Sequence, residues 1–194
     1  MNRALYEQKT FTKVVYTSTH LVDIEFDSCK FVNCDFSKSD LSKSDFMNCD
    51  FKDCDFTAAK FANTGLKKVR FTGCKLLGIN FSACKDFLLS FHFEDCILDY
   101  STFQKKKIPK TTFRNCSMKE VDFSNSDLSA SGFYDCDLMR ALFYQTNLEK
   151  VDFRTAVNYS LDPEVSKMKN ARFSLSGVPG LLDKYSILIE EPGN

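Results

Sequence analysis

The sequence contains no tryptophan, two histidines and seven glycines, and nowhere a long unbroken run of apolar residues. A helix that crosses a bilayer needs about 20 consecutive apolar residues, so none is encoded here. Residues 1–10 are too polar to form a secretory signal. We therefore expect a cytoplasmic protein without a membrane-bound segment.

Neither sign of charge is in excess, because 26 Lys and Arg residues balance 26 Asp and Glu residues. Proteins that bind nucleic acid through its phosphates need a basic excess or a concentrated basic patch, so we expect no direct nucleic-acid binding. The seven glycines form no phosphate-binding loop. Neither His20 nor His92 has a sequence neighbour that suggests a catalytic triad. The sequence thus indicates a binding protein, with no catalytic residues and no cofactor.

What the chain has in abundance is phenylalanine, with 20 residues. Between Cys29 and Phe61 a large apolar residue stands at every fifth position, two places after a small residue. These positions are Phe31, Phe36, Leu41, Phe46, Phe51, Phe56 and Phe61. Strands alternate with a period of two and helices with 3.6, so neither explains a period of five. The chain must turn every five residues.

The same register extends from Phe11 to Phe81 and, after a slip of two residues, from Leu88 to Phe153. Together the two runs contain 17 of the 20 phenylalanines. From Leu88 onward aliphatic and aromatic central residues alternate, so that opposite sides of a four-sided coil would carry phenylalanine. At the slip, over residues 84–91, we expect a bulge or kink.

The repeats resemble a known family. Cys-Asp-Phe-Ser-Lys at 34–38, Ser-Asp-Leu-Ser-Lys at 39–43 and Ser-Asp-Leu-Ser-Ala at 126–130 resemble the A(D/N)LXX unit of pentapeptide repeat proteins. The resemblance covers about residues 11–178. It implies an all-β fold, a right-handed quadrilateral β-helix in which four pentapeptides make one square coil. With coils about 4.8 Å apart, the rod would be roughly 35–40 Å tall.

All nine cysteines share one slot of the repeat, two residues before a central position, where other repeats carry Ser, Ala or Thr. The slot selects small volume, so core packing explains the cysteines, and we expect no metal site. Zinc is only the minor alternative, because the chain has no CxxC pair and contains just two histidines. Cysteines twenty residues apart would stack close enough for a disulfide, but an odd number of cysteines in a reducing cytosol favours free thiols.

Segments outside the regular repeat mark the boundaries of the rod. Residues 1–10 carry no clear repeat and are expected to form an irregular lead that caps the first coil. The pattern lapses over 158–170, where Asp162-Pro163-Glu164 is typical of a helix start. Residues 171–173 and 176–178 restore the spacing for a final coil. Residues 179–194 are expected to form a cap with a short helix and a strand.

Four lysines stand together at Lys105, Lys106, Lys107 and Lys110, and we call them the lysine corner. Lys106 falls in an inward slot and Pro109 follows a central position, so we expect the corner to bulge outward with all four lysines in solvent. Two interpretations remain open. The corner is a contact for an acidic partner or phosphate, or it is only a solvated corner.

Charge is balanced over the chain but segregated along it. Residues 20–60 hold nine acids and five bases, residues 61–119 four acids and eleven bases, and residues 120–164 nine acids and three bases. From the last stretch we take a set of candidate partner-binding residues, called the acidic band below. It comprises Glu120, Asp122, Asp127, Asp135, Asp137, Glu149 and Asp152.

The C-terminus resembles that of the Qnr-type quinolone-resistance and microcin-immunity branch of the family, in which it implies end-to-end homodimerisation. The candidate dimerisation residues are Leu181, Leu182, Tyr185, Ile187, Leu188 and Ile189. Members of that branch are similar to a DNA duplex in size and acidity and bind type II topoisomerases, protecting them from fluoroquinolones or peptide toxins. The resemblance implies DNA gyrase or topoisomerase IV as the partner, with the acidic band near the centre of a dimeric rod.

Two other interpretations remain. The protein is a general interaction scaffold with another partner, for which the basic stretch 61–119 and the lysine corner would matter more, because fold does not determine function. Alternatively, the alternating charges only keep the rod soluble. Two features count against binding to a type II topoisomerase. The long projecting loops of Qnr-type proteins are absent, and the middle of the chain is basic.

Overall fold

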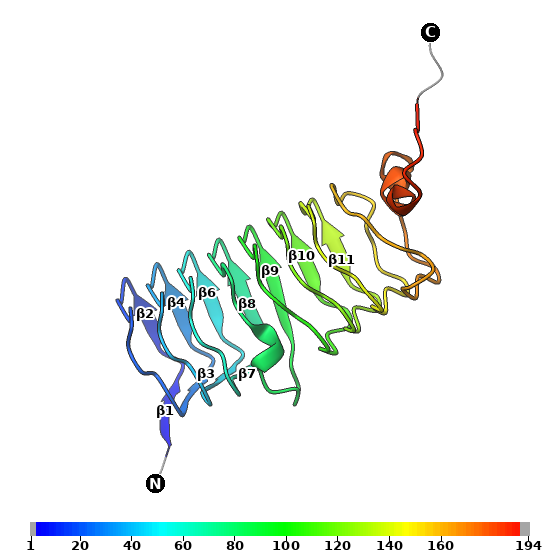
Figure 1. The fold of residues 1–194 in the computed structure, drawn as a ribbon. Coiled ribbons are helices and arrows are strands. Elements are labelled where there is room, and N and C mark those ends of the chain that lie inside the picture. Colours follow the sequence, from blue (N-terminus) through cyan, green and yellow to red (C-terminus); the bar gives the residue numbers. More distant parts are fainter. Residues whose placement is uncertain (1–2, 191–194) are drawn as a thin grey trace.

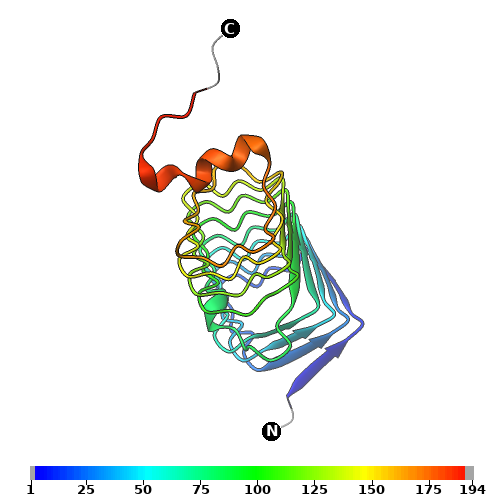
Figure 2. The ribbon, with the colours of Figure 1, turned by 90° about the vertical axis from the view of Figure 1, so that its right-hand side faces the viewer.

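The structure is a computed structural model that describes residues 3–190 and has the form of an elongated rod (Figure 1). The chain winds through successive four-sided coils, and a view turned by 90° shows these coils stacked behind one another (Figure 2). The N-terminus lies at one end of the rod and the C-terminus at the other (Figure 1). The right-handed quadrilateral β-helix expected from the sequence is confirmed.

Two of the four faces contain strands, and all strand pairs are parallel. The first face is a four-stranded sheet in the order β1-β3-β5-β7. Its strands are β1 (Ala4–Glu7), β3 (Ile24–Asp27), β5 (Asp45–Met47) and β7 (Gly65–Lys67). The second face is a seven-stranded sheet. Its strands are β2 (Thr10–Thr12), β4 (Lys30–Val32), β6 (Asp50–Lys52), β8 (Val69–Thr72), β9 (Phe91–Glu94), β10 (Thr112–Arg114) and β11 (Gly132–Tyr134).

The third and fourth faces are held by isolated parallel bridges, such as Asp35 with Asp55 and Asp40 with Lys60. Each pentapeptide on these faces still bonds to both neighbouring coils. The N–H of Phe36 donates to the carbonyl of Asp55 (2.7 Å), and the N–H of Asp55 donates to the carbonyl of Cys34 (3.0 Å). The coils therefore satisfy their backbone groups against one another.

The corner of each pentapeptide lies two residues after the central position, and there the backbone is left-handed. Lys38 has φ of 57°, and corner residues in most other coils have similar values. Non-glycine residues adopt this region at a cost. Here the corner N–H finds a carbonyl one coil away, as when Lys38 donates to Thr57 (2.9 Å), so bonding between coils offsets that cost.

Stacked aromatic rings fill the interior. Phe31 and Phe51 are stacked with ring centroids 4.7 Å apart, and Phe36 meets Phe51 edge-on at 5.9 Å. Burial of each phenylalanine contributes about 1.5–3 kcal/mol, and a well-placed aromatic pair adds about 0.5–1.5 kcal/mol. The stack crosses the register slip without a break, because Phe81 lies on Phe103 with centroids 4.5 Å apart.

All nine cysteines are buried and unpaired by disulfides. Eight of the nine thiols lie within hydrogen-bond distance of a carbonyl, as when the Cys54 Sγ–H donates to Phe31 O (3.5 Å) and Lys52 O (3.3 Å). Burial raises the pKa of Cys49 to about 12, which keeps that thiol protonated and unreactive. Within residues 3–190 no three His, Cys, Asp or Glu side chains are grouped so as to hold a metal ion.

The expectation that residues 1–10 form an irregular lead is wrong for the described residues. Residues 4–7 form β1, which pairs with β3, and Tyr6 stacks on Phe26 with ring centroids 5.3 Å apart. Tyr6 stands five residues before Phe11, so the repeat begins there rather than after an irregular lead. Lys9, in the inward slot before Phe11, is exposed. Met1 and Asn2 lie outside the described residues.

The register slip follows a short 3₁₀ helix, η1 (Phe81–Ala83). The sequence places Leu88 inward, and this is wrong: Leu88 is 50% exposed, whereas Leu89 and Phe91 are buried. Phe91 pairs with Val69 in the small-residue slot, and the regular centre resumes at Phe93. Because Leu89 and Phe91 fill the interior in this coil, Leu88 is displaced outward.

At the other end the coils close with a turn and two 3₁₀ helices. Asp162 Oδ1 accepts the N–H of Glu164 (2.9 Å) and caps a single turn at the expected position. Residues 176–178, expected in a final coil, instead belong to η2 (Leu175–Leu181), which is followed by η3 (Asp183–Tyr185). The strand expected within residues 179–194 does not form over the apolar residues 187–189. Among the described residues, no helix is long and apolar enough to cross a membrane.

Asp45 on β5 links three coils through two cations. Lys85 Nζ lies 2.6 and 2.9 Å from its two carboxylate oxygens, and Arg3 Nη1 bonds both Asp45 and Glu25. Burial acts to raise the pKa of Asp45, but the hydrogen bonds from Lys85 and Arg3 outweigh it and hold that pKa below its usual range.

Asp45→Asn should therefore reduce the acid sensitivity of the fold. A carboxyl whose pKa is lower in the folded state adds stability at neutral pH and loses it as pH falls from about 4 through the folded pKa. Thermal unfolding followed by circular dichroism should show the wild type losing more stability than the variant over this range. Glu7→Gln, whose carboxylate pairs with no cation within residues 3–190, is the control and should behave as wild type. Equal losses in the wild type and the Asp45 variant would contradict the role of Asp45.

Candidate functional site

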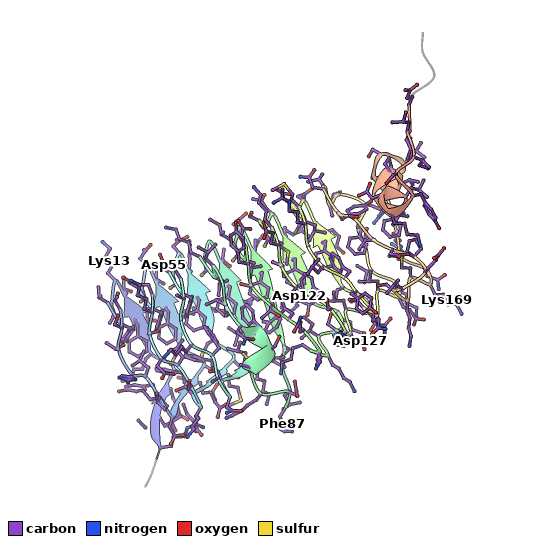
Figure 3. All side chains as sticks on the ribbon, viewed as in Figure 1. Lys13, Asp55, Phe87, Asp122, Asp127 and Lys169 are labelled. Carbon is purple, nitrogen blue, oxygen red and sulfur yellow. The ribbon has the colours of Figure 1, made fainter. Side chains whose placement is uncertain are left out.

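The acidic band encircles the rod instead of lining one face. Asp127 and Glu149 project from the continuation of the first face, Asp152 from the second, Asp137 from the third and Asp122 from the fourth, as the bridges to neighbouring coils show. Asp122 and Asp127, both labelled in Figure 3, belong to adjoining pentapeptides on different faces. The structure therefore does not collect the seven acids into one patch.

Several carboxylates of the band are occupied by the fold itself. Asp122 Oδ1 accepts the N–H of Ser124 (2.8 Å), Asp127 Oδ1 that of Ser129 (2.9 Å), and Asp137 Oδ1 that of Met139 (3.2 Å). An aspartate that bonds the N–H two residues later stabilises a turn. The main role of the repeat Asp is thus to stabilise the turn, and its surface charge is secondary.

Cations neutralise three members of the band. Asp152 is buried and pairs with Arg154 at 2.7 Å, and hydrogen bonds from Arg154 lower the pKa of Asp152. Asp137 lies 3.5 Å from Lys119, and Glu120 lies 3.5 Å from Arg140. Exposed pairs of this length are worth about 0–1 kcal/mol, so a partner could displace the two longer ones at little cost.

Asp135 and Glu149 are the members of the band whose carboxylates form neither a turn bond nor an ion pair within the described residues. Asp135 is exposed at a corner, and Glu149 is half-buried. Together with Glu120, whose side chain is 43% exposed, they are the carboxylates most available to a partner.

The lysine corner differs from its sequence expectation. The backbone stays regular over 101–110, and Lys106 is buried with its Nζ 2.7 Å from Cys84 O and 2.6 Å from Asp86 Oδ1. The register slip brings these two oxygens within reach of the inward slot, so Lys106 stays inward and bonds them, while the Asp86 side chain itself remains largely exposed. Lys105, Lys107 and Lys110 are exposed as expected.

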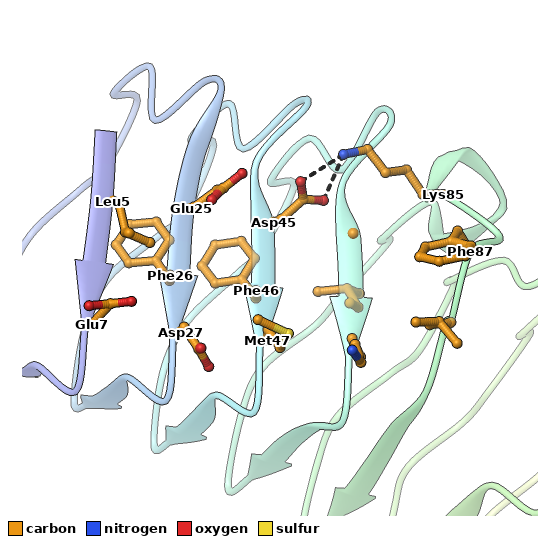
Figure 4. A pocket seen from close by; sticks show the side chains of 14 residues that line it. Leu5, Glu7, Glu25, Phe26, Asp27, Asp45, Phe46, Met47, Lys85 and Phe87 are labelled. Carbon is orange, nitrogen blue, oxygen red and sulfur yellow. Dashed lines mark hydrogen bonds and ion pairs between the residues drawn. The ribbon is translucent and has the colours of Figure 1, made fainter. Parts of the chain in front are cut away.

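A groove of about 400 Å³ lies on the first face, over β3, β5 and β7 (Figure 4). Its apolar lining includes Leu5, Met47 and Phe87, and its polar lining is mostly acidic. Gly65 has no side chain, and Asp45 leans over it so closely that a Cβ would meet Asp45 Oδ1. Lys85 reaches across from the slip to Asp45 and closes one side (Figure 4).

The C-terminal candidates are apolar and largely exposed. Leu181 packs against the core, while Tyr185, Ile187 and Ile189 are each more than half exposed and Leu188 is 91% exposed. Lys184 ties the cap to the preceding turn through Asp162 and Glu164, each at 2.7 Å. The structure thus leaves an uncovered apolar segment at this end of the rod.

Sequence reasoning missed two features of this surface. Phe87 and Leu88 project into solvent at the slip, and Asp45 joins Arg3 to Lys85 across two coils in each direction. The exposed tip could have been predicted from the sequence, because Phe87 does not fall on a central position of the repeat. For the second, the register places residues 20 apart in neighbouring coils and residues 40 apart two coils away from each other, but Arg3 precedes the clear part of the repeat.

Replacing turn-forming aspartates should destabilise the protein, whereas replacing free ones should not. Asp127→Ala removes the bond to the Ser129 N–H and should cost about 0.5–2 kcal/mol, by analogy with other side-chain caps. Asp135→Ala, the matched control in the same band, should stay within about 0.5 kcal/mol of wild type. Urea unfolding measures both. Equal effects would mean that Asp127 acts only as a surface charge.

The comparisons with known proteins agree with this geometry. A comparison with curated protein sequences finds no match. Two trypsin-treated variants of QnrB1, a plasmid-mediated fluoroquinolone resistance protein, superpose with TM-scores of 0.67 and 0.57 at 15% and 17% identity, each over 97% of this chain and 98% of that chain. HetL, which is involved in heterocyst differentiation regulation in the cyanobacterium Nostoc sp. strain PCC 7120, superposes with a TM-score of 0.64 at 13% identity, over 90% of this chain and 88% of that one.

At such identities the structural likeness shows a shared fold. The family model for the pentapeptide repeat region matches residues 24–91 and 88–158 of the sequence itself. Since these matches span well over half of the chain, the protein belongs to the pentapeptide repeat family.

Proposed function

We propose that this protein is a non-enzymatic binding protein that occupies the DNA channel of a type II topoisomerase, DNA gyrase or topoisomerase IV. The observation that carries the proposal is the likeness in shape to QnrB1 along almost the whole of both chains. A rod of stacked coils whose surface carries carboxylates can present an anionic cylinder to a basic channel. Complementary potentials steer such encounters and select partners.

The arrangement of the acidic band refines this proposal. Because the band encircles the rod, a channel that contacts several sides of the rod would meet carboxylates on each. The available charges are those of Glu120, Asp135 and Glu149. The other four members of the band form turns or, for Asp152, a shorter ion pair. Binding would then depend on these three more than on the repeat aspartates.

Homodimerisation through the C-terminus is part of the same proposal. The exposed Tyr185, Ile187, Leu188 and Ile189 would be covered by the same residues of a second copy. Two rods joined end to end place both acidic bands towards the centre. The dimer would therefore present a longer anionic surface than one chain.

The second candidate function is a regulatory scaffold for another protein. The likeness to HetL favours it, because HetL superposes almost as well as QnrB1 and is involved in regulating differentiation. Under this alternative the basic middle of the rod, with Lys105, Lys107 and Lys110, would be the contact surface.

A gyrase supercoiling assay tests the first proposal. Purified protein is titrated into the reaction with and without a fluoroquinolone, and inhibition or drug protection is expected at micromolar or lower concentration. The reversal Glu120→Lys, Asp135→Lys, Glu149→Lys should remove the effect while leaving the melting temperature unchanged. A matched reversal outside the band, Glu7→Lys, Asp53→Lys, Glu94→Lys, should retain it. If neither gyrase nor topoisomerase IV responds to the wild type, the proposal fails and the scaffold alternative stands.

Sedimentation velocity tests the dimer separately. The wild type should sediment as a dimer, and Ile187→Ser with Leu188→Ser should yield a folded monomer, because the interface loses two apolar side chains worth about 1.5–3 kcal/mol each. Leu142→Ser with Tyr144→Ser, on the side of the rod, is the matched control and should remain dimeric. A wild-type monomer at high concentration would contradict the proposed dimer.

A further inference from the structure

An apolar tip projects from the first face at the register slip. Phe87 is 81% exposed and Leu88 is 50% exposed. All 20 phenylalanines lie in the described part of the chain, and Phe87 is the one that is exposed. Figure 3 shows Phe87 at the edge of the rod, pointing away from the core. A chain that buries its other phenylalanines fully or in large part leaves this one in water, together with a leucine.

Ion pairs on both sides fix the segment that carries the tip. Lys106 is only 5% exposed, and it bonds Cys84 O at 2.7 Å and Asp86 Oδ1 at 2.6 Å. On the other side Lys85 Nζ bonds Asp45 at 2.6 Å (Figure 4). Burying an ammonium group is costly unless it is paired. The tip is therefore held in place by specific contacts.

Five further lysines, called the lysine rim, surround the tip. Lys67 lines the same groove as Phe87 and Leu88, and the Lys68 N–H donates to Ser90 Oγ at 2.8 Å. Lys105 and Lys107 flank the buried Lys106, and Lys110 follows at the next corner of that coil. Within residues 3–190 none of these five has a carboxylate within ion-pair distance.

Carboxylates on the same face are either neutralised or distant. Asp86 is bonded to Lys106, and Asp45 to Lys85 and Arg3. Asp127, Asp27 and Glu7 are two, three and four coils from the tip by strand register. At about 4.8 Å per coil these separations are roughly 10–19 Å, longer than the Debye length of about 8 Å in physiological salt. A surface that contacts the tip therefore meets five lysines without ion pairs, and the exposed Asp86 carboxylate beside the tip is paired with Lys106.

We propose that the apolar tip and the lysine rim dock the rod onto an anionic lipid bilayer. Phe87 and Leu88 would enter the boundary between headgroups and acyl chains, and the five ammonium groups would contact lipid phosphates and carboxylates. Lysine stems can lie along the apolar boundary while their charges stay in water. A nucleic acid fits less well, because the tip offers a base only the ring of Phe87 to stack on, and Leu88 beside it offers none. The sequence excludes a membrane span but not a contact of this kind.

Flotation with lipid vesicles tests the proposal on the full chain. Wild-type protein should float with vesicles of phosphatidylcholine and phosphatidylserine, and not with phosphatidylcholine alone. Phe87→Ser with Leu88→Ser should weaken partitioning by at least about tenfold, the equivalent of losing one buried apolar side chain. Lys105→Glu, Lys107→Glu, Lys110→Glu should weaken it on the order of a hundredfold. All substituted residues are exposed, and thermal unfolding verifies that the variants fold.

Two control variants separate the tip from other apolar surfaces. Leu142→Ser with Tyr144→Ser removes side chains that are 54% and 59% exposed on the fourth face and should float as wild type. Ile187→Ser with Leu188→Ser removes the exposed C-terminal segment and should also float. Absence of wild-type flotation at low salt overturns the proposal, and so does flotation that survives loss of the tip or that depends on Ile187 and Leu188. Binding to duplex DNA that is lost with the lysines but not with the tip would identify a nucleic-acid surface instead.

Discussion

The structure depends on one constraint, that each coil repeats the shape of its neighbours closely enough for identical side chains to stack one strand spacing apart. Phe31 on Phe51 and Phe81 on Phe103 show the result, with nearly parallel rings and backbone bonds between every pair of coils. Small side chains in the slot before most centres leave room for the neighbouring rings. The left-handed corners follow from the same constraint, since only a sharp turn after each centre keeps the cross-section square.

Stacking also determines the surface. A side chain meets the residue twenty positions away, so charge alternation along the sequence becomes pairing along the rod, as between Asp50 and Arg70 or Glu120 and Arg140. The repeat aspartates have a further role, because the carboxylates of Asp122 and Asp127 each accept a backbone N–H two residues later and so stabilise a turn. Much of the acidity of the repeats therefore stabilises the fold. A partner would recognise the few carboxylates that the fold does not use.

The register slip is where the rod departs from uniformity, and its consequences are local. Two additional residues displace Phe87 and Leu88 outward, draw Lys106 inward and bring Lys85 to Asp45. These contacts also form one wall of the groove on the first face. In a solenoid, where each coil contacts only its neighbours, such an insertion can change one patch of surface without altering the remainder. The slip is thus the natural place for a function that the repeats themselves do not encode.

The sequence predicts the coil, the inward positions and the packing role of the cysteines, because a strict period leaves one arrangement that buries Phe36, Phe56 and their equivalents. It misjudged residues where the period was faint or interrupted: Tyr6 in the first coil, Leu88 and Lys106 at the slip, and residues 176–178 at the end. Tertiary structure alone decided those positions, since each depends on what the adjacent coil leaves open. It also decided which acids remain available, because hydrogen bonds and ion pairs between coils depend on side-chain geometry that periodicity does not specify.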